Sequence, residues 1–392
     1  MPATLYLDTA RLGQMSPTAL KTHCDFVRLM AEDPSSLYTE NFLFGGATAA
    51  PDIPQRFPEL ARWPGIERFK QQLRAVFAAS AGSETEVLLS GRTTNLMKLG
   101  TESQRGCRRF LITDLTWPPY HRWIQRYAAR SGLTLHVLPL KRPVLDGVTA
   151  DDIVEMTQTA IHTSGADCLF LPAISHTGIR LPLQQILHLL ATSSRDIRTV
   201  IDASQAYGHI DTSSWSHLAD FVFGGCHKWL RAYLPLGVGF ARGLTSRQLR
   251  RTQSRDPLMD FCRSTATSSA GPMETVNLSP LFAARGAIHD SQHQKRHPLR
   301  FRDVEPIRRI IREQPHWQSI ETHNSLRSLM LLVRTRRDSL RRLSSQTMRA
   351  MFGRAGISVT AYPGGHLRLS MPVTGMRRDE FDRLESALRL LQ

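Results

Sequence analysis

The sequence predicts an α/β fold, with a mostly parallel sheet covered by helices and a smaller α+β domain after it. Between residues 66 and 240, amphipathic helical patterns alternate with short apolar runs, which is typical of strands buried on both faces. Many of these runs end in glycine or polar residues, at the positions where such folds bind ligands. Beyond residue 243 the alternation loosens, and helical patterns are separated by single strands.

Length and composition support a division into three parts. The chain has 392 residues, of which 41% are hydrophobic, enough for one large and one small core. We expect an N-terminal arm over residues 1–20 and a large ligand-binding domain over residues 21–260. A small α+β domain is expected over residues 261–392, with an interface loop at its start.

The net charge of +16 raises the question of a nucleic-acid partner. Only six of the 50 basic residues are lysines, and the arginines are dispersed along the chain without a zinc-finger or RNA-binding signature. No apolar run approaches the roughly 20 residues of a membrane span, and residues 1–10 lack the pattern of a signal peptide. The five cysteines form no Cys-x-x-Cys pair. We therefore expect a reduced, cytoplasmic protein without a nucleic-acid, membrane or metal partner.

The first elements precede the sheet. Residues 5–17 favour a short strand and a turn, after which Ser16-Pro17 begins a helix. Residues 40–58 are rich in glycine, alanine and proline and predict an extended loop. Residues 64–80 carry apolar side chains at helical spacing and predict an amphipathic helix.

A candidate phosphate site follows this helix. Residues 86–99 combine an apolar run, a glycine turn and the start of a helix. Gly91, Arg92 and Thr93 occupy the turn, where N–H groups at the positive end of a helix dipole face an anion. An ordinary strand-to-helix connection with an N-cap threonine fits the same residues.

The remaining patterns complete both domains. In the large domain we expect a strand and its exit loop at residues 110–120 and further strands at residues 133–138 and 167–172. A turn is expected at residues 173–182 and a helix at residues 183–194. In the small domain we expect helices at residues 277–288, 307–320, 327–351 and 377–391, and strands at residues 357–361 and 366–371.

Residues 220–242 contain the lysine on which the functional prediction depends. The apolar run at residues 221–223 ends in two glycines before a Cys-His-Lys sequence, so Lys228 is expected to follow a buried strand. Desolvation beside Trp229 would disfavour the ammonium form and leave a nucleophilic amine suited to a Schiff base. A surface lysine in a loop is the alternative.

A carboxylate ends the preceding strand. Val200 and Ile201 lead to Asp202, which stands 26 residues before Lys228 (228 − 202). Pyridoxal phosphate chemistry uses both groups, because the amine holds the aldehyde as an imine and the carboxylate keeps the pyridine nitrogen protonated. We therefore expect Lys228 and Asp202 to be the catalytic residues.

These two segments resemble those of a known family. Asp-x-x-Gln-x-x-Gly-His at residues 202–209 and His-Lys-Trp at residues 227–229 are similar to motifs of the class V aminotransferase superfamily. This superfamily of fold type I pyridoxal phosphate enzymes includes cysteine desulfurases, kynureninases and isopenicillin N epimerase-like proteins. The resemblance implies a pyridoxal 5'-phosphate cofactor, a small-molecule amino-acid substrate and a homodimer with active sites at the interface.

The resemblance also implies contacts to the cofactor phosphate. Gly91, Arg92 and Thr93 match the family's phosphate loop, His227 is expected to reach the phosphate, and Ser269 is expected to reach across the dimer interface. Thr94 stands where the family has glutamate. Gly225 stands where the family often has a serine, so one phosphate hydrogen bond is expected to be absent, and Arg92 is a candidate to replace it.

Other residues are expected to contact the cofactor ring and the substrate. The resemblance implies that Trp117 stacks on the ring, that His176 or Thr177 contacts its oxygen, and that Gln205 reaches its hydroxyl. His366-Leu-Arg-Leu-Ser370 is similar to the family's x-Arg-x-Ser motif, so Arg368 is expected to pair with the substrate carboxylate.

Together these residues predict an enzyme that acts on an amino acid or amino-acid conjugate through a Schiff base at Lys228. A lyase for C–S cleavage or a related β-elimination, a decarboxylase and an aminotransferase remain open, as does a role in specialised metabolism. No cysteine follows Cys262, which argues against the persulfide mechanism of the desulfurases. A non-catalytic binding or regulatory protein is the alternative from another class.

Overall fold

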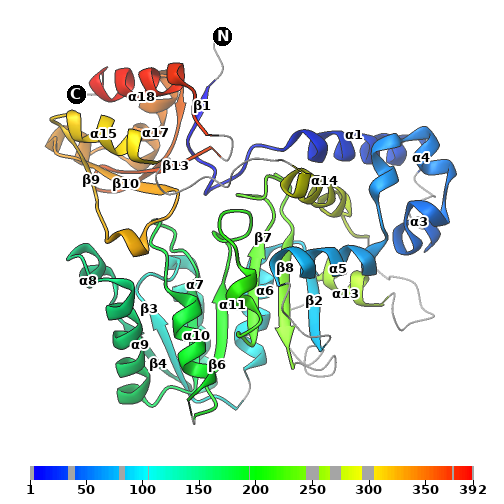
Figure 1. Cartoon of the computed structure of the whole chain (residues 1–392), viewed down its shortest axis with the longest axis horizontal. Helices are drawn as coiled ribbons and strands as arrows, with labels where there is room; N and C mark the ends of the chain where they lie inside the picture. Colours follow the sequence, from blue (N-terminus) through cyan, green and yellow to red (C-terminus); the bar gives the residue numbers. More distant parts are fainter. Residues whose placement is uncertain are drawn as a thin grey trace.

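A seven-stranded sheet forms the centre of the larger part of the described chain (Figure 1). The structure is a computed structural model that describes all residues except 1–3, 34–39, 79–83, 105, 194, 244–255, 265–274, 294–303, 373–374 and 391–392. The strands, in spatial order, are β2 (Thr85–Ser90), β8 (Gly237–Arg242), β7 (Phe221–Gly225), β6 (Arg198–Asp202), β5 (Cys168–Pro172), β3 (Arg109–Thr113) and β4 (Thr134–Leu138). β8 runs antiparallel to both neighbours, and the other adjacent pairs are parallel. The predicted mostly parallel sheet is confirmed.

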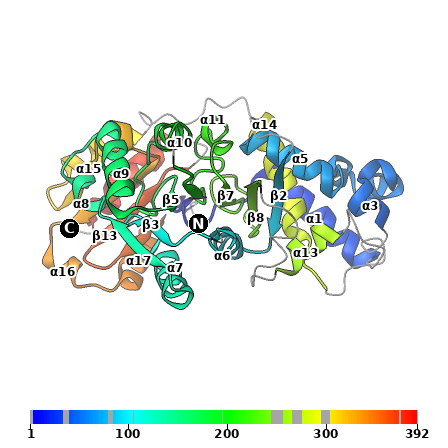
Figure 2. The same ribbon diagram turned by 90° about the horizontal axis from the view of Figure 1, so that it is seen from below.

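Helices cover both faces of this sheet, as the apolar strands predict (Figure 2). α5 (Ile66–Phe77), α9 (Ala150–Ser164) and α10 (Leu183–Ala191) pack on one face, and α6 (Thr93–Ser103) and α7 (Pro118–Ser131) pack on the other. Side chains along each strand alternate between the two cores because neighbouring residues point to opposite faces.

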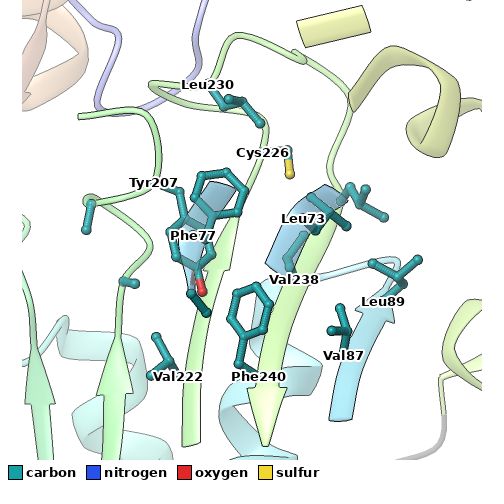
Figure 3. Packing of buried hydrophobic residues seen from close by; sticks show 14 of the residues in the cluster. Leu73, Phe77, Val87, Leu89, Tyr207, Val222, Cys226, Leu230, Val238 and Phe240 are labelled. Carbon is teal, nitrogen blue, oxygen red and sulfur yellow. The ribbon is translucent and has the colours of Figure 1, made fainter. Parts of the chain in front are cut away.

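β7 illustrates this alternation. Phe221 and Phe223 pack with α6 and α7, whereas Val222 joins the opposite core. Figure 3 shows Val222 on that opposite side, in the same cluster as Phe240 and Phe77. A strand that is buried on both faces has to be apolar at every position, which explains its continuous apolar run.

A second core lies around a four-stranded antiparallel sheet near the C-terminus. Its order is β12 (Thr360–Tyr362), β13 (His366–Ser370), β10 (Met330–Thr335) and β9 (Trp317–Ser319). The helices α15 (Glu305–Glu313), α17 (Ser345–Arg354) and α18 (Arg378–Leu390) supply apolar side chains to the same core. This part has the α+β character that the sequence predicts.

The N-terminal segment connects the two cores. β1 (Leu5–Tyr6) pairs in parallel with β11 (Ile357–Ser358) and belongs to the second core. The chain then continues into α1 (Pro17–Glu32), which packs against α14 (Ser279–His293) and the first core. A Cβ at Gly286 would lie 2.7 Å from Ala19 Cα, so the two helices need glycine there. α14 therefore contributes to the first core, although the sequence places it in the small domain. The domain boundaries at residues 20 and 260 remain predictions.

Three predictions of individual elements are wrong. Residues 40–58 form α3 (Glu40–Gly45), α4 (Asp52–Arg56) and a 3₁₀ turn instead of an extended loop. The helix expected over residues 307–320 ends at Glu313, and β9 follows it. A helix was expected over residues 327–351, but residues 330–335 form β10. The apolar run of β10 pairs with the two neighbouring strands, β13 and β9. Tertiary pairing overrides local helical periodicity in such short segments.

No helix within the described ranges combines the length and apolar character required to cross a membrane.

Candidate active site

A cavity of about 760 Å³ lies where the large sheet, the second sheet and the N-terminal segment meet. Its wall includes residues that follow β6 and β7, the start of α6, and residues of β12 and β13. Parallel strands present their carboxyl ends at one edge, which is where open α/β sheets bind ligands. Ala10 and Arg11 of the N-terminal segment also line the cavity.

Lys228 lies on the wall of this cavity, three residues after the end of β7. Burial lowers its pKa from 10.5 to about 8; the Asp202 carboxylate opposes this shift and the Arg368 guanidinium adds to it. The lowered pKa leaves a larger uncharged fraction of the amine near neutral pH. Such an amine is a suitable nucleophile for a carbonyl group.

The loop that carries Lys228 is held tightly against the N-terminal segment. Gly13 N–H donates to His227 O at 2.8 Å, and a Cβ at Gly13 would lie only 1.9 Å from Lys228 O. Arg231 and Tyr233 adopt positive φ angles of 69° and 63°, which non-glycine residues rarely do. The backbone around the lysine is thus fixed by contacts that leave no room for a larger residue at position 13.

Asp202 ends β6 and lines the same cavity as Lys228. Its Oδ1 atom accepts a hydrogen bond from Ser204 N–H at 2.9 Å. Burial raises the pKa of Asp202, whereas the Ser204 hydrogen bonds and the Lys228 ammonium lower it. The predicted pair of an amine and a carboxylate therefore faces one cavity.

The first residue of α6 and the side chain of His227 each carry a buried polar atom that is available to a ligand. Thr93 Oγ1 and His227 Nδ1 are buried and have no hydrogen-bond partner within the described part of the chain. A Cβ at Gly225 would lie 2.8 Å from both the Thr93 hydroxyl oxygen and the His227 ring, so the glycine leaves these atoms room for a ligand. Burial lowers the pKa of His227 to about 4, so its ring is neutral near pH 7.

The three residues of the predicted phosphate loop also line the cavity, but they are not equivalent. Gly91, Arg92 and Thr93 all contribute to the wall. The Gly91 N–H already points to the carboxylate of Asp256, at 3.2 and 3.3 Å from its two oxygens. The first N–H groups of α6 and the Thr93 hydroxyl are the donors that remain for an anion. Sequence reasoning missed Asp256, which follows a basic stretch without a motif.

Trp117 lies on the cavity wall with 42% of its surface exposed. Its ring packs edge-on against Tyr120, with the centroids 4.8 Å apart. Tyr120 is buried and lines the cavity, although it was not among the predicted site residues. Its position in the first turn of α7, three residues after Trp117, was the available signal.

Gln205 lines the cavity, but its amide group is engaged in the protein. Nε2 donates to Ala10 O and Oε1 accepts from Trp229 Nε1, both at 2.8 Å. The Trp229 ring stacks on His209 with the centroids 3.8 Å apart. Gln205 thus links the N-terminal segment to the residue next to Lys228.

His176 and Thr177, the two residues predicted to contact the ring oxygen, line different pockets. His176 lines the cavity, and its Nδ1 atom is buried without a partner among the described residues. Burial, with neighbouring cations including Arg368, lowers the pKa of His176 to about 4. Thr177 lines a different, much smaller pocket, and its hydroxyl is hydrogen-bonded to Ser175 Oγ at 2.9 Å. Ser269 lies outside the described residues.

Arg368 in β13 lines the cavity opposite the large sheet, and part of its guanidinium is already engaged. Nη1 donates to His176 O at 3.0 Å, and Nη2 donates to Thr360 Oγ1 at 3.1 Å and Asp8 Oδ1 at 3.4 Å. Nε is buried without a partner within the described ranges. The pairing of Asp8 with Arg368 was not predicted, because the two residues lie 360 positions apart in the sequence.

One family model matches the part of the chain that carries the site. The family model for aminotransferase class-V matches residues 65–253, which include both β6 and β7 and the loops after them. No curated protein sequence matches the chain.

Solved structures resemble the whole chain at low sequence identity. A complex of the cystine C–S lyase with its product, cysteine persulfide, is 15% identical over 99% of this chain and 97% of that chain, with a TM-score of 0.73. A mutant of the same lyase with glycine covalently linked to its PLP cofactor is 15% identical over 99% and 96%, with a TM-score of 0.69. Ureidoglycine–glyoxylate aminotransferase from Bacillus subtilis is 13% identical over 100% and 93%, with a TM-score of 0.69. At these identities the likeness shows the fold.

Proposed function

We propose that this chain, whose residues 65–253 match the family model for aminotransferase class-V, is a pyridoxal 5'-phosphate-dependent lyase or aminotransferase acting on an amino acid or amino-acid conjugate. The observation that carries the proposal is the pairing of Lys228, with a pKa lowered to about 8, and Asp202 on the wall of one cavity. The presence of both Lys228 and Asp202 on one cavity favours catalysis over a protein that only binds.

The residues of the cavity fit this cofactor. The unpartnered Thr93 hydroxyl, the His227 ring and the start of α6 provide donors for a phosphate. Lys228 provides an amine for an aldehyde, and Asp202 provides a carboxylate for a protonated pyridine nitrogen. Trp117 supplies a flat ring on the same wall. The phosphate, the aldehyde, the pyridine nitrogen and the ring face of pyridoxal 5'-phosphate each have a chemically matched partner.

When bound, the cofactor supplies an electron sink for the bonds to the substrate Cα. Lys228 Nζ would attack the aldehyde carbon and later carry a proton to or from the substrate Cα, which requires the uncharged amine. The negative charge of Asp202 would favour protonation of the nitrogen beside it. Arg368 would bind and orient the substrate carboxylate, with Nε as a donor that is still free in the described structure.

The cysteines bear on the choice of reaction. All five cysteines lie in the described part of the chain, and none of them lines the cavity. A desulfurase that stores sulfur on its own cysteine is therefore not supported, whereas C–S cleavage that releases the sulfur product needs no such residue. The proposal keeps the lyase and the aminotransferase as the two reaction types.

The test is incubation of the purified protein and cofactor with a panel of amino acids, including thioether conjugates, with products identified by mass. A lyase gives ammonia and a fragmented side chain without a keto-acid acceptor, and an aminotransferase requires the acceptor and converts it to an amino acid. Lys228→Ala should abolish turnover, and Lys21→Ala, an exposed lysine in α1, should not. Protein that takes up no cofactor at Lys228 would refute the proposal.

Homodimer formation and a cytoplasmic location remain predictions. Sedimentation of the purified protein, with and without cofactor, tests the first of them. A monomer at micromolar concentration would contradict the expected interface.

A further inference from the structure

The carboxylate of Asp256 joins four groups at the back of the predicted phosphate loop. It accepts hydrogen bonds from Ser90 Oγ, from Gly91 N–H, from Asn95 Nδ2 at 2.6 Å and from Met259 N–H at 3.1 Å. Asp256 is 2% exposed, and it does not line the cavity. Because four donors surround the carboxylate, its negative charge is compensated locally.

These hydrogen bonds connect the starts of two helices. The bond from Met259 N–H lies in the first turn of α13 (Pro257–Ser264), where Asp256 caps the helix. The bonds from Ser90, Gly91 and Asn95 hold the end of β2, the turn after it and the first turn of α6. α13 has a second attachment to β2, the 3.0 Å salt bridge between Arg263 and Glu86. A variant that breaks only the Arg263–Glu86 attachment can therefore show which effects come from α13 and which come from Asp256.

The position of Asp256 decides which donors of the loop face the cavity. With the Gly91 N–H directed backwards to the carboxylate, the N–H groups at the start of α6 and the Thr93 hydroxyl remain for a ligand. Ser90 Oγ also accepts a hydrogen bond from Arg92 N–H at 3.2 Å, which fixes the turn from within. Loss of the carboxylate would free the Gly91 N–H and loosen the turn on which all these donors depend.

We propose that Asp256 is a positioning residue that shapes the turn at residues 90–92 for the phosphate group of the cofactor. This inference rests on the proposed function, since it concerns the phosphate of pyridoxal 5'-phosphate. Asp256 touches neither cofactor nor substrate and acts through the turn. It therefore determines the preference of the site for the phosphorylated cofactor over pyridoxal, which has the same ring and aldehyde but no phosphate.

The experiment compares the binding of pyridoxal 5'-phosphate and of pyridoxal to the cofactor-free protein by visible absorbance. Asp256→Ala should weaken pyridoxal 5'-phosphate at least about tenfold and pyridoxal by less than about twofold. Asp256→Asn should stay within about threefold of the wild type for both compounds. Its amide oxygen still accepts from Gly91 and Met259, its NH₂ group can donate to Ser90 Oγ, and the Asn95 amide can turn so that its oxygen accepts the other hydrogen of that NH₂ group.

Two further variants serve as controls. Arg263→Ala breaks the other attachment of α13 and should leave the ratio of the two affinities unchanged. Asn95→Ala removes one donor to Asp256 and should weaken only the phosphorylated compound, by about threefold. This variant keeps the test decisive if Asp256→Ala folds poorly. Inorganic phosphate should raise the melting temperature of the cofactor-free wild type more than that of Asp256→Ala.

The outcomes distinguish the inference from the proposed function. Equal weakening of both compounds in Asp256→Ala and in Asn95→Ala would overturn the positioning role, as would failure of Asp256→Asn to retain the preference for phosphate. Wild-type protein that binds neither compound at Lys228 would overturn the proposed function, and this inference with it.

Discussion

Attachment of the cofactor to Lys228 is expected to depend on pH with a midpoint near 8. Only the uncharged amine attacks an aldehyde, and burial lowers the pKa of Lys228 from 10.5 to about 8. At a pH of about 7.5, an amine with the ordinary pKa is about 0.1% uncharged, and one with a pKa near 8 is about one quarter uncharged. Burial therefore raises the concentration of the reactive form roughly 200-fold.

Two variants should move this midpoint in opposite directions. The Asp202 carboxylate raises the pKa of Lys228, so Asp202→Asn should lower the midpoint. The Arg368 guanidinium lowers the same pKa, so Arg368→Gln should raise it. Asp211→Asn, which removes an exposed carboxylate, should leave the midpoint where it is.

The assay is rapid mixing of cofactor-free protein with pyridoxal 5'-phosphate over a range of pH. The logarithm of the attachment rate should rise with pH with a slope of about one and level off above the midpoint, because one proton is lost. The intrinsic titration of the cofactor is removed by reference to its reaction with a free alkyl amine. A midpoint near 10.5 would show that Lys228 is not desolvated, and shifts of the same sign in the Asp202 and Arg368 variants would refute the electrostatic account.

Two other substitutions test the substrate clamp and the lysine loop. Arg368→Gln should raise KM for the amino acid about 10- to 100-fold with a smaller change in kcat, as measured by steady-state kinetics. Arg334→Gln, at an exposed position in β10, should leave both constants unchanged. An unaltered KM in Arg368→Gln would contradict the assignment. Gly13→Ala brings a Cβ within 1.9 Å of Lys228 O and should cost at least about 3 kcal/mol of unfolding free energy along with cofactor uptake. Gly353→Ala has no atom within 4 Å of the new Cβ and should slightly stabilise the protein in denaturant titrations.

The large sheet could be predicted because its signals are local. Each strand is a short apolar run that ends in a turn, and the helices between strands show their period directly. β10 was missed because its apolar run precedes a helical pattern without a glycine or proline to separate them. Its pairing with β13 and β9 depends on residues distant in the sequence.

The site residues likewise divide into those with a local sequence pattern and those that depend on distant partners. Lys228 and Asp202 could be predicted because each follows the end of a buried strand, and parallel strands end at one edge. Asp256 and Asp8 could not, because each acts through partners more than 150 residues away. Neither long-range pairing can be recognised from the spacing of residues in the sequence, and a single aspartate has many ordinary roles.

Asp8 bears on how Arg368 would bind a substrate. Both side chains are 5% exposed, and a buried guanidinium without a counterion is costly, so Asp8 stabilises the empty site. The same carboxylate opposes a second anion on the arginine, and this limits the affinity for the substrate carboxylate. Binding that is moderate in the ground state leaves more of the interaction energy for the transition state. In the proposed enzyme, Asp8 would therefore favour turnover by preventing Arg368 from holding substrate and product too tightly.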